Sequence, residues 1–240
     1  MWRAIMAVIV SITLGCPAAA SLQNPDRHAI AVRPHDAPRP QDSHPLQLLD
    51  HNNIVTVTIT VHAAPTVPLV VVDRALVEAS AIWRPAGVIF EWQKEDSGPT
   101  AFTPPQATRP RVIIDESRGT WRDSGAPLGW VNFAGDEPDG DIHISHGNAE
   151  QFILAFAGVA GVTRRMSPAE RFLLLGRTLG RALAHEIGHY LLRSRGHATS
   201  GLMKGRRTVK EFIDPNRHGF DIDGSDQEAA ARRIREITEA

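Results

Sequence analysis

The sequence predicts an α+β domain with a twisted mixed β-sheet, one long central helix and a small helical part at the C-terminus. Alternating apolar and polar residues at 53–62 and 88–92 are typical of half-buried strands. The run from Ser167 to Leu192 repeats apolar residues at helical spacing. No internal repeat or second domain is evident, so we expect one domain over residues 51–240.

The composition is that of a single globular domain. A hydrophobic content of 42% in 240 residues suits one sizeable core. The net charge of -1 gives no indication of nucleic-acid binding or of attraction to an anionic membrane surface.

Residues 1–20 are typical of a secretory signal peptide. A basic start at Arg3 precedes an apolar run from Ala4 to Leu14, and residues 18–20 supply a small-residue cleavage pattern. We expect cleavage after Ala20 and a secreted or periplasmic protein. The apolar run is too short to span a bilayer well, so no stable membrane insertion is expected.

Cys16 is the only cysteine in the chain. Leu14-Gly15-Cys16 is weakly similar to a lipoprotein processing site, but Thr13 stands where leucine is usual, so we favour cleavage over lipidation. Loss of Cys16 leaves no disulfide framework in the mature chain.

Residues 21–50 are rich in proline and histidine and carry few large apolar residues. This composition is typical of a flexible linker or a short pro-segment. The histidines within it are expected to be solvated.

The first half of the domain alternates strands with one helix. Apolar residues recur at helical spacing before Trp83, and Gly87 marks the stop. The expected bounds are 53–62 for the first strand, 70–83 for the helix, 88–92 for the second strand, 96–110 for a proline-rich loop and 111–115 for the third strand.

The second half begins with a hairpin-like pair of strands at 128–133 and 141–145, joined by a turn at 135–140. Residues 149–161 form either a helix or a buried segment, and the pattern does not decide between them. Two helical pieces follow the long helix, at 208–213 and 225–238. Ser225 and Glu228 are expected to form a capping box in the second piece.

Two features near the hairpin have metal-binding alternatives. The acidic turn at 135–140 could bind calcium, although a solvated turn is the favoured interpretation. His143 and His146 could hold a second metal, but single histidines near a strand end are more often structural or exposed.

The long helix has a clear start and a stripe of small residues. Ser167 and Glu170 form a capping box, with proline between them in the first turn. Small residues then recur every four positions, at Gly176, Gly180, Ala184 and Gly188. Glycine costs about 1 kcal/mol in a helix relative to alanine, so another segment is expected to pack very closely there. That segment is either a strand, the loop that carries the metal, or simply the tightly packed core.

The C-terminal part of this helix contains the motif H-E-x-x-H at residues 185–189. Residues four apart share one helix face, about 6 Å apart along the axis, so His185 and His189 can bind one metal ion. Glu186 is turned by about 100° from His185, where a base can take a proton from a metal-bound water. Two ligands and a base are the minimum for a zinc hydrolase.

A catalytic zinc ion needs a third protein ligand, and His197 is the predicted one. It directly follows Gly196, which we expect to turn the chain left-handed out of the helix.

These residues resemble the metzincin metallopeptidases, whose motif is H-E-x-x-H-x-x-G-x-x-H followed by a methionine turn. Here Leu192 stands at the glycine position and Arg195 at the position of the third histidine, two residues before His197. Residues 201–203, Gly-Leu-Met, are similar to a compressed methionine turn. The resemblance spans roughly residues 53–203.

The resemblance implies a metzincin- or zincin-like fold and a Zn²⁺-dependent endopeptidase that acts on peptide or protein substrates. The three histidines would bind zinc, and Glu186 would act as the base. Met203 would form an apolar floor beneath the histidines without being a ligand. One strand between 128 and 145 would be the edge that pairs with an extended substrate.

Two alternatives stay open. In other zincins the third ligand is a downstream acidic residue, for which Glu211 or Asp214 is the candidate. The chain could also be a secreted metal-binding protein without catalysis. Glu186 argues against this, because a purely structural site needs no such carboxylate.

Overall fold

The computed structural model describes residues 54–95, 110–116, 127–160 and 166–239. The predicted signal peptide, linker and proline-rich loop lie outside this part, as do residues 117–126. The elements are β1 (Val55–Ala63), α1 (Leu69–Trp83), the short 3-10 helix η2 (Arg84–Ala86), β2 (Val88–Lys94), β3 (Arg111–Asp115), β4 (Gly129–Ala134), β5 (Glu137–Ser145), α2 (His146–Ala160), α3 (Pro168–Leu192), α4 (Val209–Ile213) and α5 (Gly224–Glu239).

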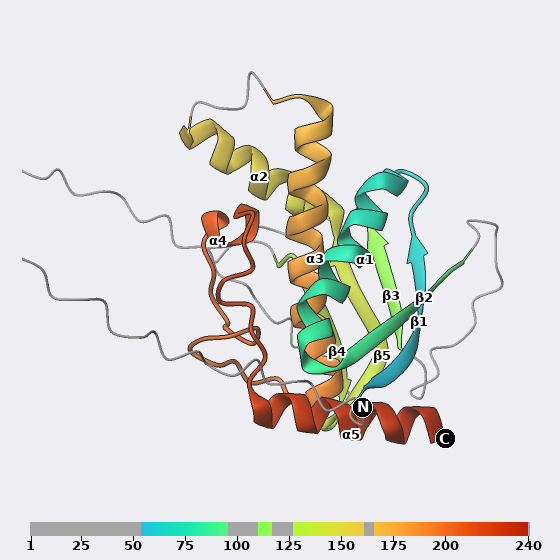
Figure 1. Cartoon of the computed structure of the whole chain (residues 1–240). Helices are drawn as coiled ribbons and strands as arrows, with labels where there is room; N and C mark the ends of the chain where they lie inside the picture. Colours follow the sequence, from blue (N-terminus) through green and yellow to red (C-terminus); the bar gives the residue numbers. More distant parts are fainter. Residues whose placement is uncertain (1–53, 96–109, 117–126, 161–165, 240) are drawn as a thin grey trace, which may run out of the picture.

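The five strands form one mixed sheet in the order β2-β1-β3-β5-β4 (Figure 1). β1, β2, β3 and β5 are parallel, and β4 runs antiparallel to β5 at one edge. On β1, Val57, Ile59 and Val61 are buried in the core, which is the alternation expected of a half-buried strand. The α+β prediction, with its mixed sheet and C-terminal helices, is confirmed.

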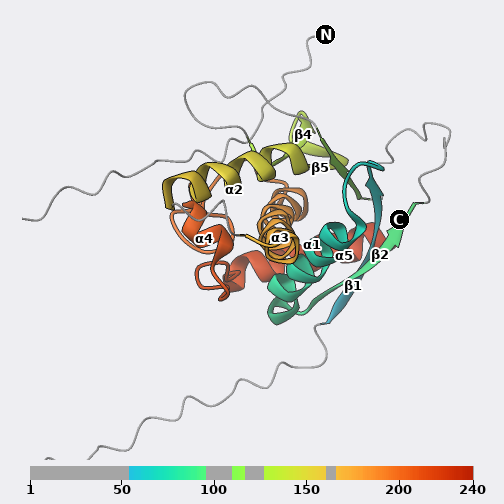
Figure 2. The ribbon, with the colours of Figure 1, turned by 90° about the horizontal axis from the view of Figure 1, so that it is seen from above.

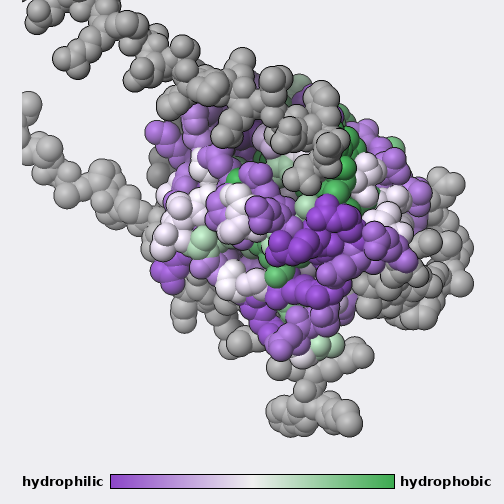
Figure 3. All heavy atoms as spheres, turned by 60° about the horizontal axis from the view of Figure 1, so that its bottom comes forward, coloured by the Kyte–Doolittle hydropathy of each residue, from purple (hydrophilic) through white to green (hydrophobic). Residues whose placement is uncertain are grey.

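The long helix α3 is the centre of the molecule. Viewed along its axis, α3 is surrounded by α1, α2, α4 and the sheet (Figure 2). Every residue from Thr178 to Leu191 is buried. α5 crosses the end of the sheet below α3 (Figure 1), and its outer face is mainly hydrophilic (Figure 3).

The predicted start of α3 is confirmed. Ser167 Oγ accepts a hydrogen bond from the Glu170 N–H, and the Ser167 N–H donates to the Glu170 carboxylate at 2.7 Å. Both bonds satisfy backbone or side-chain groups that the first helical turn leaves open.

The stripe of small residues is where α1 packs against α3. A Cβ on Gly180 would lie 2.5 Å from the Glu78 Cβ and 2.6 Å from the Ala75 carbonyl oxygen. A Cβ on Gly176 would lie 2.4 Å from the Arg74 Cβ. The expected close approach is therefore confirmed, and the partner here is a helix rather than a strand.

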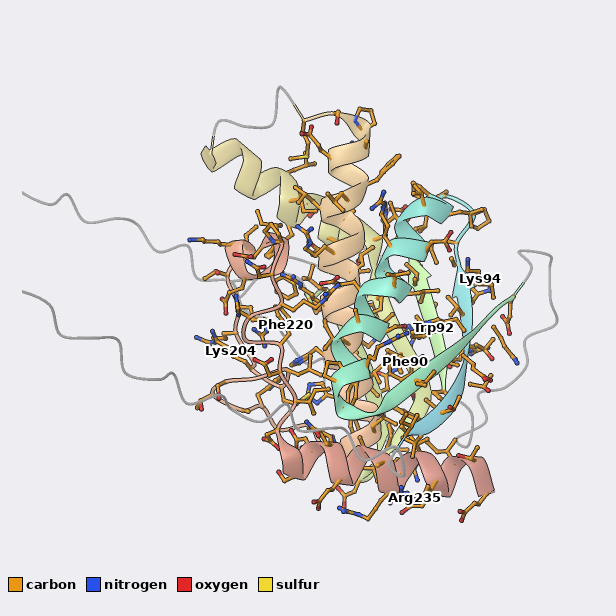
Figure 4. The ribbon with its side chains drawn as sticks, in the orientation of Figure 1. Phe90, Trp92, Lys94, Lys204, Phe220 and Arg235 are labelled. Carbon is orange, nitrogen blue, oxygen red and sulfur yellow. The ribbon has the colours of Figure 1, made fainter. Side chains whose placement is uncertain are left out.

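Aromatic side chains of β2 complete this layer. Phe90 and Trp92 both lie between β2 and α1 in Figure 4. The Trp92 Nε1–H donates to Ser80 Oγ at 3.0 Å, and the Trp83 Nε1–H reaches the Ala184 carbonyl of α3 at 3.1 Å. The helix pair and the parallel part of the sheet are thus joined by side-chain bonds as well as by apolar contact.

The structure changes the predicted hairpin and resolves the segment that the sequence left undecided. The β4–β5 turn is short, with Gly135 at φ 65, and β5 already begins at Glu137. Pro138 is accepted in the strand because it pairs with Phe133 beside a register shift, where the ladder is irregular. Residues 146–160 form a helix, α2, which settles the undecided segment.

The start of α5 was predicted wrongly. Its first turn is capped by Asp223, whose Oδ1 accepts from the Asp226 N–H at 2.9 Å and from Ser225 Oγ at 2.8 Å. Ser225 is a donor to this cap and lies inside the helix, because Asp223 offers an acceptor two residues earlier.

Across the described residues, no helix combines the length and apolar character needed to cross a membrane.

We predict that Gly180→Ala destabilises the protein, although alanine is the better helix former by about 1 kcal/mol. The added methyl group meets the backbone and Cβ of α1, so the helix pair must separate, at an expected cost of about 1–3 kcal/mol. Urea unfolding measures this loss. Gly224→Ala is the matched control, because a Cβ there meets nothing within 4 Å. Equal stability of Gly180→Ala and the wild type would contradict the close packing.

Candidate metal centre

Three predicted residues come together at the end of α3. His185 and His189 project from neighbouring turns of the helix, and His197 arrives from the following loop. One ligand nitrogen of each ring lies within 4.8 Å of the others. The ring centroids are separated by 4.7 Å for the helical pair, and His197 lies 5.3 and 4.9 Å from His185 and His189.

Backbone carbonyls orient the two helical histidines. His185 Nδ1 lies 2.8 Å from the Leu202 carbonyl oxygen, and His189 Nδ1 lies 2.5 Å from the Ser194 carbonyl oxygen. A carbonyl can only accept, so each Nδ1 carries the proton and each Nε2 is left with a lone pair. These two Nε2 atoms face each other at 3.1 Å.

This arrangement fits a zinc ion. Two lone pairs 3.1 Å apart repel each other unless a cation lies between them. Tetrahedral zinc with Zn–N bonds of about 2.0–2.1 Å requires ligand nitrogens about 3.3 Å apart. The hydrogen bonds from Nδ1 to carbonyls are the usual support of zinc-bound imidazoles.

Burial keeps both helical histidines neutral. Burial, followed by the charge of His189, lowers the pKa of His185 to about 3. Burial likewise lowers the pKa of His189 to about 4. Neutral imidazole is the form that binds metal, so both rings are ready ligands at neutral pH. Burial also lowers the pKa of His197, which is the most exposed of the three.

The turn that brings His197 back is made by Arg193, and not by Gly196 as predicted. Arg193 is left-handed, with φ 50, whereas Gly196 has no positive φ. The N–H groups of Arg193 and Ser194 both donate to the His189 carbonyl and close the helix. Ion pairs from Arg193 to Glu137 and Glu236 hold this unusual residue in place.

The returning loop packs against His197 through Gly205, a residue that the sequence pattern did not single out. The Ala198 N–H donates to the Met203 carbonyl at 2.8 Å and narrows the loop. A Cβ on Gly205 would lie 2.8 Å from His197 Cγ, so only glycine fits beneath the ring. In the sequence, the only indication of this close contact was the position of Gly205 two residues after the Gly-Leu-Met segment.

Met203 packs against the turn of α3 that carries His185 and His189. Its side chain is 7% exposed, and a Cβ on Gly188 would lie 2.3 Å from its sulfur. The last glycine of the small-residue stripe therefore makes room for the loop, while the earlier ones make room for α1. Leu202, the preceding residue, supplies the carbonyl that holds His185.

Glu186 directly follows His185 on α3, and its side chain is closed off from solvent. It is fully buried, and both carboxylate oxygens lack a hydrogen-bond partner among the described residues. Burial raises the pKa of Glu186 well above its ordinary value. Its Cγ would be 2.7 Å from a Cβ on Gly129, so the edge strand β4 passes directly over this side chain.

The acidic alternatives for the third ligand are engaged elsewhere. Glu211 caps α4 through Thr208 and pairs with Lys204, the residue labelled in Figure 4, at 2.8 Å. Asp214 ends α4, and its carboxylate accepts from the Asn216 N–H at 2.8 Å. Neither belongs to the histidine group.

The two histidines of the hairpin region are separated from each other. His143 stacks on Trp130 with ring centroids 5.0 Å apart, whereas His146 contacts Glu116. They do not form the shared site that the sequence left open.

No family model matches the chain, and no curated protein matches it significantly. Among solved structures, the chain is similar to the crystal structure of archaemetzincin from Methanopyrus kandleri. The TM-score is 0.40 and the identity 13%, over 78% of this chain and 99% of that chain. A similarity this low does not establish an activity for this chain.

We predict that His197→Ala weakens zinc binding by at least about 100-fold, since losing a ligand exceeds the usual effect of losing a supporting partner. Competition with a chromogenic chelator measures the affinity. Glu211→Gln is the control and should bind zinc normally, because glutamine preserves the capping box. Full affinity in His197→Ala, with a loss in Glu211→Gln, would reverse the assignment.

Proposed function

We propose that the chain is a secreted zinc-dependent metalloendopeptidase. The observation that carries this proposal is the pair of unprotonated Nε2 atoms, 3.1 Å apart, on His185 and His189. His197 completes a set of three ligands, and Glu186 directly follows the first of them on α3. A set of three histidines with an adjacent carboxylate is suited to metal-assisted hydrolysis.

The residues of the chain divide the chemistry between them. His185, His189 and His197 would hold the metal. Zinc held there would act as a Lewis acid and would lower the pKa of a bound water to about 7. Glu186 would accept the proton of the attacking water and deliver it to the leaving amine. Burial raises the pKa of Glu186 above its ordinary value, which makes the carboxylate a stronger proton acceptor.

β4 is the proposed place for the substrate. It is an edge strand, and in the described part of the chain no strand pairs with its outer side. An extended peptide can add to such an edge through main-chain hydrogen bonds. Gly129 places this edge against Glu186, so a peptide paired with β4 would pass the base.

Secretion is proposed from residues 1–20 alone, which have the composition of a signal peptide. Peptides or proteins outside the cytoplasm are therefore the proposed substrates. All residues of the proposed site come from one chain, so a monomer is sufficient for the proposed activity.

We predict that Glu186→Gln reduces peptide hydrolysis by about 10²–10⁴-fold while zinc stays bound, because the amide cannot take the proton. Digestion of a peptide library, followed by mass spectrometry, measures turnover, and metal analysis measures zinc. Glu91→Gln, which changes an exposed carboxylate on β2, should keep full activity.

A chelator should stop the wild type and Glu91→Gln alike. Undiminished hydrolysis by zinc-loaded Glu186→Gln would remove this residue from the mechanism. A zinc-loaded wild type that cleaves no peptide would leave only the alternative of a metal-binding protein without catalysis.

A further inference from the structure

A second group of metal-type ligands lies at the start of α2. It consists of Glu116, which follows β3, and of His146 and Glu150 in the first turns of α2. One ligand atom from each lies within 4.8 Å of the others. His146 and Glu150 are four residues apart and therefore share one helix face. Glu116 approaches from the sheet, with its Oε1 2.9 Å from His146 Nδ1.

His146 is buried more deeply than a surface ion pair requires. The residue is 3% exposed, and its Nε2 has no hydrogen-bond partner among the described residues. The Glu116 side chain is 38% exposed and the Glu150 side chain 22%, so the group opens to solvent on its acidic side. A buried imidazole beside two carboxylates has the donor atoms of a site for a divalent cation.

The charges of the group are unbalanced without a cation. Glu116 and Glu150 bring two carboxylates together, and like charges at this distance repel each other. Arg171 pairs with Glu150 and offsets part of this charge.

We propose that Glu116, His146 and Glu150 form a second, structural site for a divalent ion of the zinc or manganese class. One imidazole nitrogen with two carboxylates suits these ions, whereas calcium prefers oxygen ligands only. The ion would tie the end of β3 to the first turn of α2. The site shares no residue with the group of His185, His189 and His197, so its test is independent of the proposed peptidase activity.

The test is the number of zinc ions per chain after equilibration with Zn²⁺ and removal of the excess, measured by mass spectrometry of the metal. We expect two ions in the wild type and one in His146→Gln. The double variant His185→Ala/His189→Ala, which lacks the first site, should also retain one. Addition of His146→Gln to that double variant should remove the last ion.

Two further variants distinguish the loss of an ion from misfolding of the protein. Glu116→Gln changes an accessible side chain without changing its shape and should also lose one ion. Arg171→Gln should keep both ions, because it removes only a competitor for Glu150. Cooperative thermal unfolding confirms that each variant is folded. A single ion in the wild type, or two ions in folded Glu116→Gln, would overturn the proposal.

Discussion

Two backbone carbonyls, from Ser194 and Leu202, hold the imidazoles of the H-E-x-x-H motif so that two lone pairs meet. The Nε2 atoms of His185 and His189 are 3.1 Å apart in a buried position, where no water can separate them easily. Such a pair is stable only around a cation or a proton, and burial disfavours the proton. Both carbonyls belong to the loop after α3, so the conformation of this loop and the metal site depend on each other.

The rest of the fold keeps α3 and this loop in contact. The small-residue stripe lets α1 and Met203 approach the same helix at different heights. Arg181, fully buried on α3, pairs with Glu78 of α1 at 3.0 Å. Its other nitrogens donate to the carbonyls of Glu211 and Asn216 at 2.6 and 2.7 Å. These bonds hold the segment around α4 against α3. An unpaired charge in that position would cost several kcal/mol, roughly 3–5.

Local periodicity and capping predicted the bounds of α1, α3 and β3 and the start of α3, but the capping box expected in α5 was wrong. The placement of His185 and His189 on one helix face followed from spacing. The left-handed turn did not, because Arg193 adopts it through partners on β5 and α5 that are distant in the sequence. Gly205 and Gly129 were missed for the same reason: each is required by a side chain that only the fold brings near it.

The proposed activity requires a zinc ion held by two histidines of α3 and one of the returning loop. Anomalous diffraction at the zinc edge, from crystals of the zinc-loaded protein, locates this ion. We expect an anomalous peak about 2.0–2.1 Å from a ring nitrogen of each of His185, His189 and His197. A peak bound by Glu211 or Asp214 in place of His197, or no peak at the histidines, would contradict it.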